Sequence, residues 1–356
     1  MLTDTTTDGA LLDPSDDLVG RVTRWAGEVT ELDDPVGATL GQLPGLGREA
    51  PRPGSGDTLR LFDLLSRVAA VDLVVARTVE PHLDALSILD QAPEPPNLDA
   101  IGVGPSATWG VFAAEGPGVR VTATRRGDGW TVSGHKPWSS LGRRLTHALV
   151  TAWTGERTRR LFAVPLRHEG VAVESSDRWI ARGMALIPSV GIDLTDVPAV
   201  PVGEDGWYLT RPGFWWGAVG VAACWYGGAT AVAELLHPRP GREPDQVALM
   251  HLGEADTALF AARTALQHAA AQIDASGQDA AGRSTELLAR RVRGLVRQVG
   301  DDVLARTSRA TGPGPLVSQE RHARRVADLH LYLRQEHAER DAAALGQALQ
   351  QQDGAT

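Results

Sequence analysis

The side chains that most often carry metal or nucleophilic chemistry are few and scattered in this sequence. Cys224 is the only cysteine, which excludes an intramolecular disulfide, a cysteine-rich zinc site and an iron–sulfur cluster. The ten histidines do not follow metal-ligand spacing. His330 and His337 share a helical face, but no carboxylate stands three or four residues from both on that face. We therefore expect no metal site.

Short motifs for phosphate or acyl chemistry are also missing. The sequence contains no Walker loop, no G-x-S-x-G nucleophile elbow and no H-E-x-x-H helix. The glycine pairs at Gly102–Gly104 and Gly312–Gly314 lack a strand–turn–helix context. They are more typical of loops than of a dinucleotide site.

Charge and composition limit the partners. The 356-residue chain carries a net charge of −9, which argues against a general nucleic-acid surface. Its start is acidic and polar, without the basic and apolar regions of a signal peptide, so we expect a cytoplasmic protein. The 22 residues from 212 to 233 carry no charge and could span a membrane, but five glycines and a proline favour a buried, closely packed helix.

The elements that must position any site fall into blocks. Residues 1–16 are predicted to form a disordered tail, and residues 17–103 a helical domain interrupted by a Pro/Gly-rich loop at Leu43–Asp57. Alternating apolar runs flank the turn RRGDG and recur further on, which predicts a small barrel or sandwich over 104–205. Helical periodicity returns over 206–350.

The β region resembles a known family. The string GWTVSGHKPWSSLGRRLTHALVTA at Gly129–Ala152 is similar to the strand–turn segment G-x-K-x-W-[IV]-[TS] of the acyl-CoA dehydrogenases. WGVFAAEG at Trp109–Gly116 resembles the flavin-edge segment of that family, and the string at Trp179–Gly203 resembles the segment downstream. The likeness covers residues 40–345, and the order of helices, strands and helices agrees throughout.

This resemblance implies the fold class and the cofactor. The implied fold is α+β, multidomain and acyl-CoA dehydrogenase-like: an N-terminal helical domain, a central β-barrel and a C-terminal helical bundle. It implies FAD bound between the barrel and the C-terminal helices, in a homodimer or homotetramer that acts on a small-molecule or thioester substrate. An electron-transfer flavoprotein or a reductase is the implied redox partner.

The same resemblance implies flavin contacts. Trp138 matches the tryptophan that packs against the isoalloxazine ring. Ser140 points to the same face of an extended strand, and its hydroxyl could donate to flavin N5. Ser139 lies between them and joins the candidate contacts. Three residues match the backbone segment at the pyrimidine edge of the flavin: Phe112, Ala113 and Ala114.

The adenine end of FAD is expected to be held by a neighbouring subunit. Gln246 matches the glutamine of that contact, and Arg239 or Arg242 could supply the arginine, with a spacing shorter than usual. Gly312 and Gly314 replace a Gly-Gly-x-Gly turn near the adenosine phosphates, now interrupted by prolines. A plain loop between two helices is the alternative interpretation of these glycines.

Several positions have lost the residues usual in the family. The Gly-Ser-Asp that grips the FAD pyrophosphate is missing, because the loop after Glu115 is shorter. No arginine lies around Gly217–Gly220, where the family has one. The usual catalytic glutamate falls at Leu333, which belongs to an apolar stripe and should face inward. Glu336, reached by a small shift of the alignment, and His330 are the remaining candidates for a catalytic group.

Three functions are compatible with these matches and losses. The first is an FAD-dependent oxidoreductase that oxidises an acyl thioester or a related specialised substrate at Cα–Cβ, with hydride transfer to FAD. The second is a flavin-dependent monooxygenase of the same fold, which needs no α-proton base and has His330 and His82 as candidate polar groups. The third is an inactive family member that acts as a partner or scaffold subunit, its substrate cavity filled by Trp215, Trp216 and Trp225.

Overall fold

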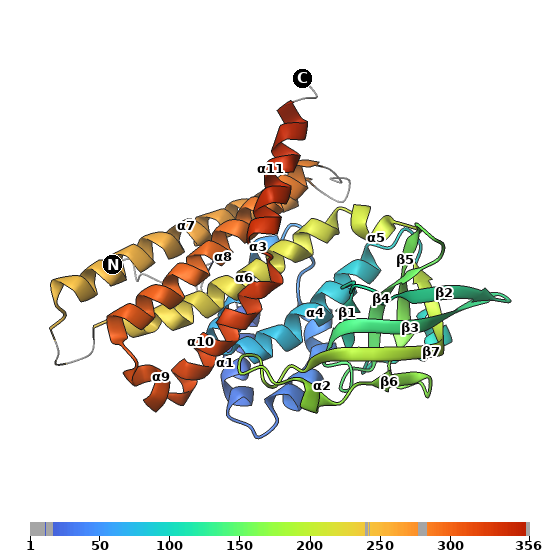
Figure 1. Ribbon diagram of the computed structural model, residues 1–356, viewed down its shortest axis with the longest axis horizontal. Helices are drawn as coiled ribbons and strands as arrows, with labels where there is room; N and C mark the ends of the chain where they lie inside the picture. The colour runs from blue at the N-terminus through green and yellow to red at the C-terminus, as the bar shows by residue number, and fades with distance from the viewer. Residues whose placement is uncertain (1–10, 12–16, 239–240, 242, 277–282, 354–356) are drawn as a thin grey trace.

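Helices occupy one side of the molecule and a sheet the other (Figure 1). The computed structural model describes residues 11, 17–238, 241, 243–276 and 283–353. The tail expected at residues 1–16 lies outside the described residues except for Leu11. That residue is 3% exposed, and its backbone donates to Asp63 and accepts from Gln267. At Leu11 the chain is therefore docked on the helices, and the expectation of disorder is wrong there.

Four helices form the N-terminal block. They are α1 (Asp17–Thr30), α2 (Pro35–Glu49), α3 (Thr58–Val71) and α4 (Leu73–Asp90), followed by the 3₁₀ turn η2 (Leu98–Ile101). The loop predicted at Leu43–Asp57 is wrong over its first part, because α2 continues to Glu49. Leu43 and Leu46 are buried, and α2 packs along α4. That burial outweighs the cost of Pro44 inside a helix.

The C-terminal block contains the longest helices, and its last helix rises away from the others (Figure 1). The helices are α5 (Trp207–Thr210), α6 (Gly213–Ala233), α7 (Gln246–Ser276), α8 (Arg283–Thr311), α9 (Gly314–Ser318), α10 (Glu320–Tyr332) and α11 (Glu339–Asp353). The 3₁₀ turns η4 (Glu234–Leu236) and η5 (Leu333–Gln335) follow α6 and α10.

Two aspartates join the first helices to the last ones. Asp274 of α7 accepts from the backbone N–H groups of Gly56 and Thr58, each at 3.0 Å, and so caps α3 from outside. Asp72 ends α3 and caps α4 through a backbone N–H at 2.7 Å. The same carboxylate pairs with Arg324 of α10 at 2.8 Å. The N-terminal helices are thus held in place by contacts from far along the chain.

Seven strands form the sheet. They are β1 (Trp109–Phe112), β2 (Val121–Arg126), β3 (Gly129–Ser140), β4 (His147–Trp153), β5 (Arg159–Pro165), β6 (Val171–Val173) and β7 (Ser189–Val202). The predicted hairpin is confirmed, with Arg126 opposite Gly129 across the RRGDG turn. The order is β1-β4-β2-β3-β7-β5, with β6 beside β7. Strand β4 pairs with both β2 and β5. The strands therefore form a closed circuit of pairings, in the order β4, β2, β3, β7, β5 and back to β4.

Helix α6 is the uncharged segment of the sequence, and it runs through the core. The stretch Gly213–Leu236 is long and apolar enough to cross a membrane, but 83% of its most apolar window is buried inside the protein. Its glycines bring other helices close: a Cβ at Gly227 would overlap with the backbone carbonyl of Ser66 on α3. The prediction of a buried, closely packed helix is therefore confirmed.

Gly227→Ala should destabilise the protein by about 2 kcal/mol or more, because the added methyl group meets backbone that cannot rotate away. Gly253→Ala on the exposed side of α7 is the matched control, since nothing lies within 4 Å of its Cβ position. The control should be neutral or stabilising by up to about 1 kcal/mol. Urea unfolding followed by circular dichroism measures both. Equal effects would contradict the close approach of α3 and α6.

Candidate functional site

The end of β3 combines backbone strain with an exposed aromatic ring. Trp138 and Leu141 both have φ values of +57°, in the left-handed region that residues other than glycine rarely adopt. The Trp138 side chain is 63% exposed, although large aromatic rings are normally well buried. Such strain persists where the surrounding structure enforces it, and it clusters at functional sites. This strand end is therefore the first candidate for a ligand contact.

Ser140 links the end of β3 to α4. Its hydroxyl lies 2.7 Å from the Ser189 hydroxyl on β7 and accepts a hydrogen bond from the Arg77 guanidinium at 3.2 Å. Ser139 is fully buried and donates to the Lys136 carbonyl at 3.2 Å, so its side chain shapes the strand from within. Of the two serines, Ser140 is the one with a partly exposed polar group.

The three residues expected at the flavin edge follow one another at the end of β1. Phe112 is 3% exposed and packs into the core, whereas Ala113 is half-buried and Ala114 is exposed. At the start of β1, the backbone N–H of Trp109 donates to Nδ1 of His82 at 3.2 Å. Burial lowers the pKa of His82 to about 4, so this ring is a neutral acceptor that fixes β1 against α4. His82 thus has a structural partner.

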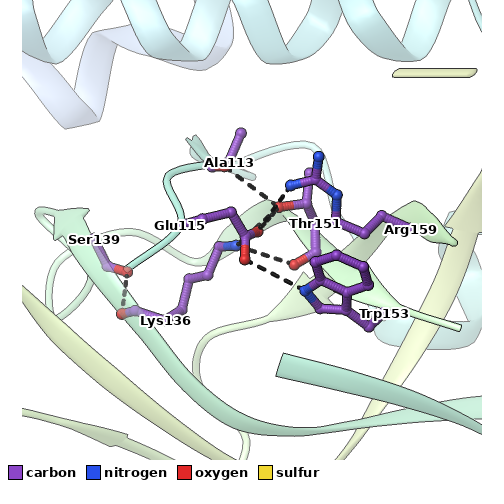
Figure 2. Close-up of polar contacts among 7 residues, drawn as sticks. All are labelled: Ala113, Glu115, Lys136, Ser139, Thr151, Trp153 and Arg159. Carbon is purple, nitrogen blue, oxygen red and sulfur yellow. Dashed lines mark hydrogen bonds and ion pairs between the residues drawn. The ribbon is translucent and has the colours of Figure 1, made fainter. Parts of the chain in front are cut away.

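An ion pair between a buried lysine and a partly exposed glutamate holds the segment after β1 against β3 (Figure 2). Lys136, the only lysine of the chain, is 1% exposed. Its Nζ donates to the Glu115 carboxylate at 2.9 Å and to the Thr151 hydroxyl at 2.8 Å. Burial raises the pKa of Glu115, but the hydrogen bond and the charge of Lys136 outweigh burial and lower it. The carboxylate therefore stays ionised opposite the ammonium group.

A charged cluster lies behind the strand end, on α4. Arg77, Glu80 and Asp84 share one helical face by their spacing. Arg77 lies 3.6 Å from Glu80, and Asp84 lies 3.9 Å from Arg211. Burial raises the pKa of Glu80 to about 7; Arg77 opposes this shift, Asp84 adds to it, and Arg293 opposes it. Burial therefore favours the protonated, neutral form of the Glu80 carboxyl group.

Two glycines of α6 make room for this cluster. A Cβ at Gly217 would lie 2.5 Å from the Asp84 carboxylate, and a Cβ at Gly213 would collide with the Arg211 guanidinium. Arg293 of α8 donates to the carbonyl of residue 218 at 2.7 Å. The Arg293 guanidinium thus places a positive charge beside residues 217–220 of α6, where the helix has no arginine of its own.

Sequence reasoning missed both the ion pair and the cluster. Lys136 stood out only as the single lysine, within a strand of mostly uncharged residues. Arg77, Glu80 and Asp84 interrupt an otherwise apolar helix at spacings that place them on one face, and this was the signal available for the cluster.

The candidate acid–base residues near the chain end are engaged elsewhere or exposed. Leu333 faces inward as predicted, is fully buried and packs against Gly300 of α8. Glu336 is 4% exposed, and its carboxylate accepts from Arg297 at 3.0 Å and from a backbone N–H at 2.8 Å. It therefore ties the end of α10 to α8. His330 is exposed on α10.

The start of α7 and the link between α8 and α9 lie at the end of the helical block that faces away from the sheet (Figure 1). Gln246 begins α7 and is exposed. Gly312, with a φ of +65°, follows the end of α8, and Gly314 is the first residue of α9. Arg239 and Arg242 lie outside the described residues. Within one chain, the structure does not bring Gln246, Gly312 or Gly314 to the end of β3.

The tryptophans of α6 fill the interior in different places. Trp216 and Trp225 are fully buried, whereas Trp215 is half-buried beneath the Arg290 guanidinium, 4.7 Å from its ring centre. Trp216 packs under the loop before α3, and Trp225 lies 4.6 Å from the Arg293 guanidinium. Trp225 is thus the one that borders the charged cluster.

Glu115→Gln should leave the Lys136 ammonium buried without its counter-ion. We expect the free energy of unfolding to fall by about 2 to 4 kcal/mol, toward the lower value because the Glu115 side chain is 32% exposed. Urea unfolding measures the loss. The control is Glu156→Gln in the exposed turn after β4, which should change stability by less than about 0.5 kcal/mol. A loss no larger than that of the control would show that the pair is dispensable.

Glu80→Gln should change how stability depends on pH. Because burial raises the pKa of Glu80 from 4.5 to about 7, the folded state keeps a proton that the unfolded state releases between those values. Stability therefore falls as the pH rises through this window. Glutamine cannot titrate, so the fall in melting temperature from pH 5 to pH 8 should be smaller in the variant. Glu320→Gln, on the exposed start of α10, should keep the original slope; identical slopes in all three proteins would refute the assignment.

No protein-family model matches the sequence, and no curated protein matches it either. Solved structures do match. KijD3 in complex with FMN and dTDP-3-amino-2,3,6-trideoxy-4-keto-3-methyl-D-glucose has a TM-score of 0.73 and 21% identity, covering 96% of each chain. Methanesulfinate monooxygenase MsuC from Pseudomonas fluorescens has a TM-score of 0.70 and 17% identity, covering 94% of this chain and 95% of that one.

Butyryl-CoA dehydrogenase from Megasphaera elsdenii is similar over 95% of this chain and 100% of its own, with a TM-score of 0.71 and 16% identity. At such identities the likeness concerns the fold, and the fold is shared by enzymes with different names. The acyl-CoA dehydrogenase-like fold expected from the sequence is thereby confirmed.

Proposed function

We propose that this chain is a flavin-dependent monooxygenase that works with reduced flavin and O₂. One observation carries the proposal: the strand end that would meet a flavin is present, while the position expected for an α-proton base is the fully buried Leu333. Oxidation at Cα–Cβ needs such a base, and oxygenation does not. The fold is shared with KijD3 in complex with FMN, with a methanesulfinate monooxygenase and with butyryl-CoA dehydrogenase, so this likeness supports a flavin enzyme of either kind.

The residues at the end of β3 fit a flavin ring on their exposed side. The hollow beside Ser140 has a volume of about 10 Å³, enough for one water molecule, so a ring would have to lie on the outer side with Trp138. An indole ring there gives a flat stacking surface. The Ser140 hydroxyl and the backbone of Ala113 and Ala114 supply polar contacts of the kind a flavin edge needs.

Reduced flavin would supply two electrons to O₂, so that one oxygen atom enters the substrate and the other leaves as water. The residues of the chain would prepare the place for this reaction. Arg77 holds the Ser140 hydroxyl and keeps a positive charge beside the strand end, which stabilises negative charge there. Trp138 would shield one face from solvent. Lys136 and Glu115 keep the two contact segments together.

The charged cluster on α4 favours a polar substrate over an acyl chain. Charged groups are costly beside a buried alkyl chain, since they lose water without gaining a partner. Glu80 itself is 8% exposed and does not line the hollow beside Ser140, so it would act on a substrate through the Arg77 guanidinium, 3.6 Å away. We therefore propose oxygenation of a nitrogen or sulfur atom in a polar molecule.

The proposed partners follow from this reaction. A separate reductase would supply the reduced flavin. FAD, the form implied by the sequence, would need the adenine contacts at Gln246 and Gly312 from a second copy of the chain. FMN would need the ring contacts and a site for its phosphate.

An α,β-dehydrogenase is the second candidate, and Glu80 is the observation that favours it. A carboxyl group whose pKa is raised to about 7 and that is linked through Arg77 to Ser140 would be the base. Because Glu80 is 8% exposed, a bound acyl group would have to displace Arg77 to reach it. This reaction would reduce bound flavin without O₂.

The test separates binding from reaction. Tryptophan fluorescence is followed while the protein is titrated with FMN and FAD, oxidised and reduced. Ser140→Ala should weaken flavin binding about fivefold through the loss of one hydrogen bond. Ser133→Ala, on the same strand but paired with Asp196, is the control and should bind as the native protein does. Reduced flavin and O₂ are then supplied with panels of amines and sulfides, and mass spectrometry detects the gain of one oxygen atom.

Oxygenated product that depends on protein and reduced flavin would establish the monooxygenase. Bleaching of bound FAD by an acyl-CoA under nitrogen, blocked by Glu80→Gln and without any oxygenated product, would establish the second candidate instead. Absence of binding for all four flavin forms would overturn both.

A further inference from the structure

A positively charged hollow lies next to the candidate site, at the ends of β1 and β4 and the start of β2. Its volume is about 570 Å³, within the range of small-molecule sites. The lining residues are Glu115, Gly116, Gly118, Val119, Arg120, Trp153 and Arg159. A second hollow of about 240 Å³ shares Arg159 and continues to Ala113 and Thr151.

The floor of the hollow is an aromatic ring flanked by guanidinium groups. The Arg120 guanidinium lies 4.1 Å from the centre of the Trp153 ring, and that of Arg159 lies 5.0 Å from it. The indole N–H of Trp153 donates to the Glu115 carboxylate at 3.4 Å, so the ring is anchored by the same carboxylate that holds Lys136 (Figure 2). The ring and its cations therefore form a preorganised surface.

The charges around the hollow do not balance. Glu115 is the single carboxylate among the lining residues, and it already pairs with Lys136 at 2.9 Å and faces Arg159 at 3.6 Å. Among the described residues, no carboxylate lies within ion-pair distance of Arg120, which is exposed. In a chain of net charge −9, this local excess of positive charge favours an anion.

The hollow is continuous with the flavin-edge segments. Gly116 packs against Pro137, the residue before Trp138, since a Cβ at Gly116 would lie 3.2 Å from the proline ring. The second hollow reaches Ala113, the backbone contact expected at the flavin edge. An anionic group held at Arg120 and Arg159 would therefore belong to a ligand that extends toward the end of β3.

We propose that this hollow binds the phosphate or diphosphate group of a ligand, by Arg120 and Arg159, whose guanidinium groups are positioned by the Trp153 ring. Guanidinium groups match phosphate oxygens in fork geometry, and the contacts of both groups with one anchored ring limit their motion. Two sources share this chemistry: a nucleoside-diphosphate-linked substrate and the phosphate of the flavin itself. Binding of the phosphate group does not depend on the proposed function. Only the reaction at the other end of the ligand rests on that function.

The test uses the full-length, flavin-free protein and isothermal titration with inorganic pyrophosphate and thymidine diphosphate. Arg120→Ala should weaken both at least about tenfold, the loss expected for a charge-assisted contact to phosphate. The matched control is Arg125→Ala, an exposed arginine on the following strand that does not line the hollow and changes the net charge equally. Its affinity should stay within about twofold of the native value. Because no turnover is measured, this outcome does not depend on the proposed reaction.

A second titration with riboflavin and FMN distinguishes the sources. If the flavin phosphate is the ligand, the native protein prefers FMN, and Arg120→Ala removes that preference. If a nucleotide-linked substrate is the ligand, Arg120→Ala weakens thymidine diphosphate but leaves the ratio of FMN to riboflavin affinity unchanged. Either result supports the phosphate site. Equal losses in Arg120→Ala and Arg125→Ala, or no binding of pyrophosphate, thymidine diphosphate or the flavin phosphate, overturns it.

Discussion

One buried charge fixes the geometry of the candidate site. The Lys136 ammonium lies inside the sheet, where an unpaired charge would cost several kcal/mol. The segment after β1 must therefore bring Glu115 to it, and β4 must present the oxygen atoms of Thr151. Since Lys136 stands two residues before Trp138, the same requirement determines where the strained backbone begins. The exposed ring is thus held by an ion pair that cannot shift without unpairing a charge.

Helix α6 carries no charged residue, but charged side chains from other parts of the chain lie against it. Its glycines remove side chains where α3 approaches at Gly227 and where Asp84 and Arg211 approach at Gly217 and Gly213. A helix with larger side chains at these positions would push α4 away and separate Arg77 from Ser140. The apolar composition that suggested a membrane span is therefore what allows a polar cluster to lie between helices.

Local signals in the sequence were sufficient for the strands and for part of the site. The hairpin at RRGDG and the strand HALVTAW follow from alternation and turn chemistry, which act over a few residues. The prediction of a loop over Leu43–Asp57 was wrong for its first part, because the burial of Leu43 and Leu46 outweighs the helix-breaking effect of Pro44. Trp138 and Ser140 stood within one recognisable string. By contrast, Lys136 meets Glu115 across 21 residues, and Arg77 meets Ser140 across 63, and no local pattern connects such pairs.

The layout of the chain divides the expected cofactor contacts between its two ends. The end of β3 and the strands β4 and β5 beside the hollow lie in the sheet, whereas the start of α7 and the link between α8 and α9 lie where the helical block faces away from it (Figure 1). Contacts to a flavin ring and to a nearby phosphate can come from one chain. The adenine contacts implied by the sequence resemblance would come from a second copy. The proposed cofactor and the proposed assembly are therefore linked: the contacts proposed for the ring and its first phosphate lie within one chain, whereas those proposed for adenine would require two.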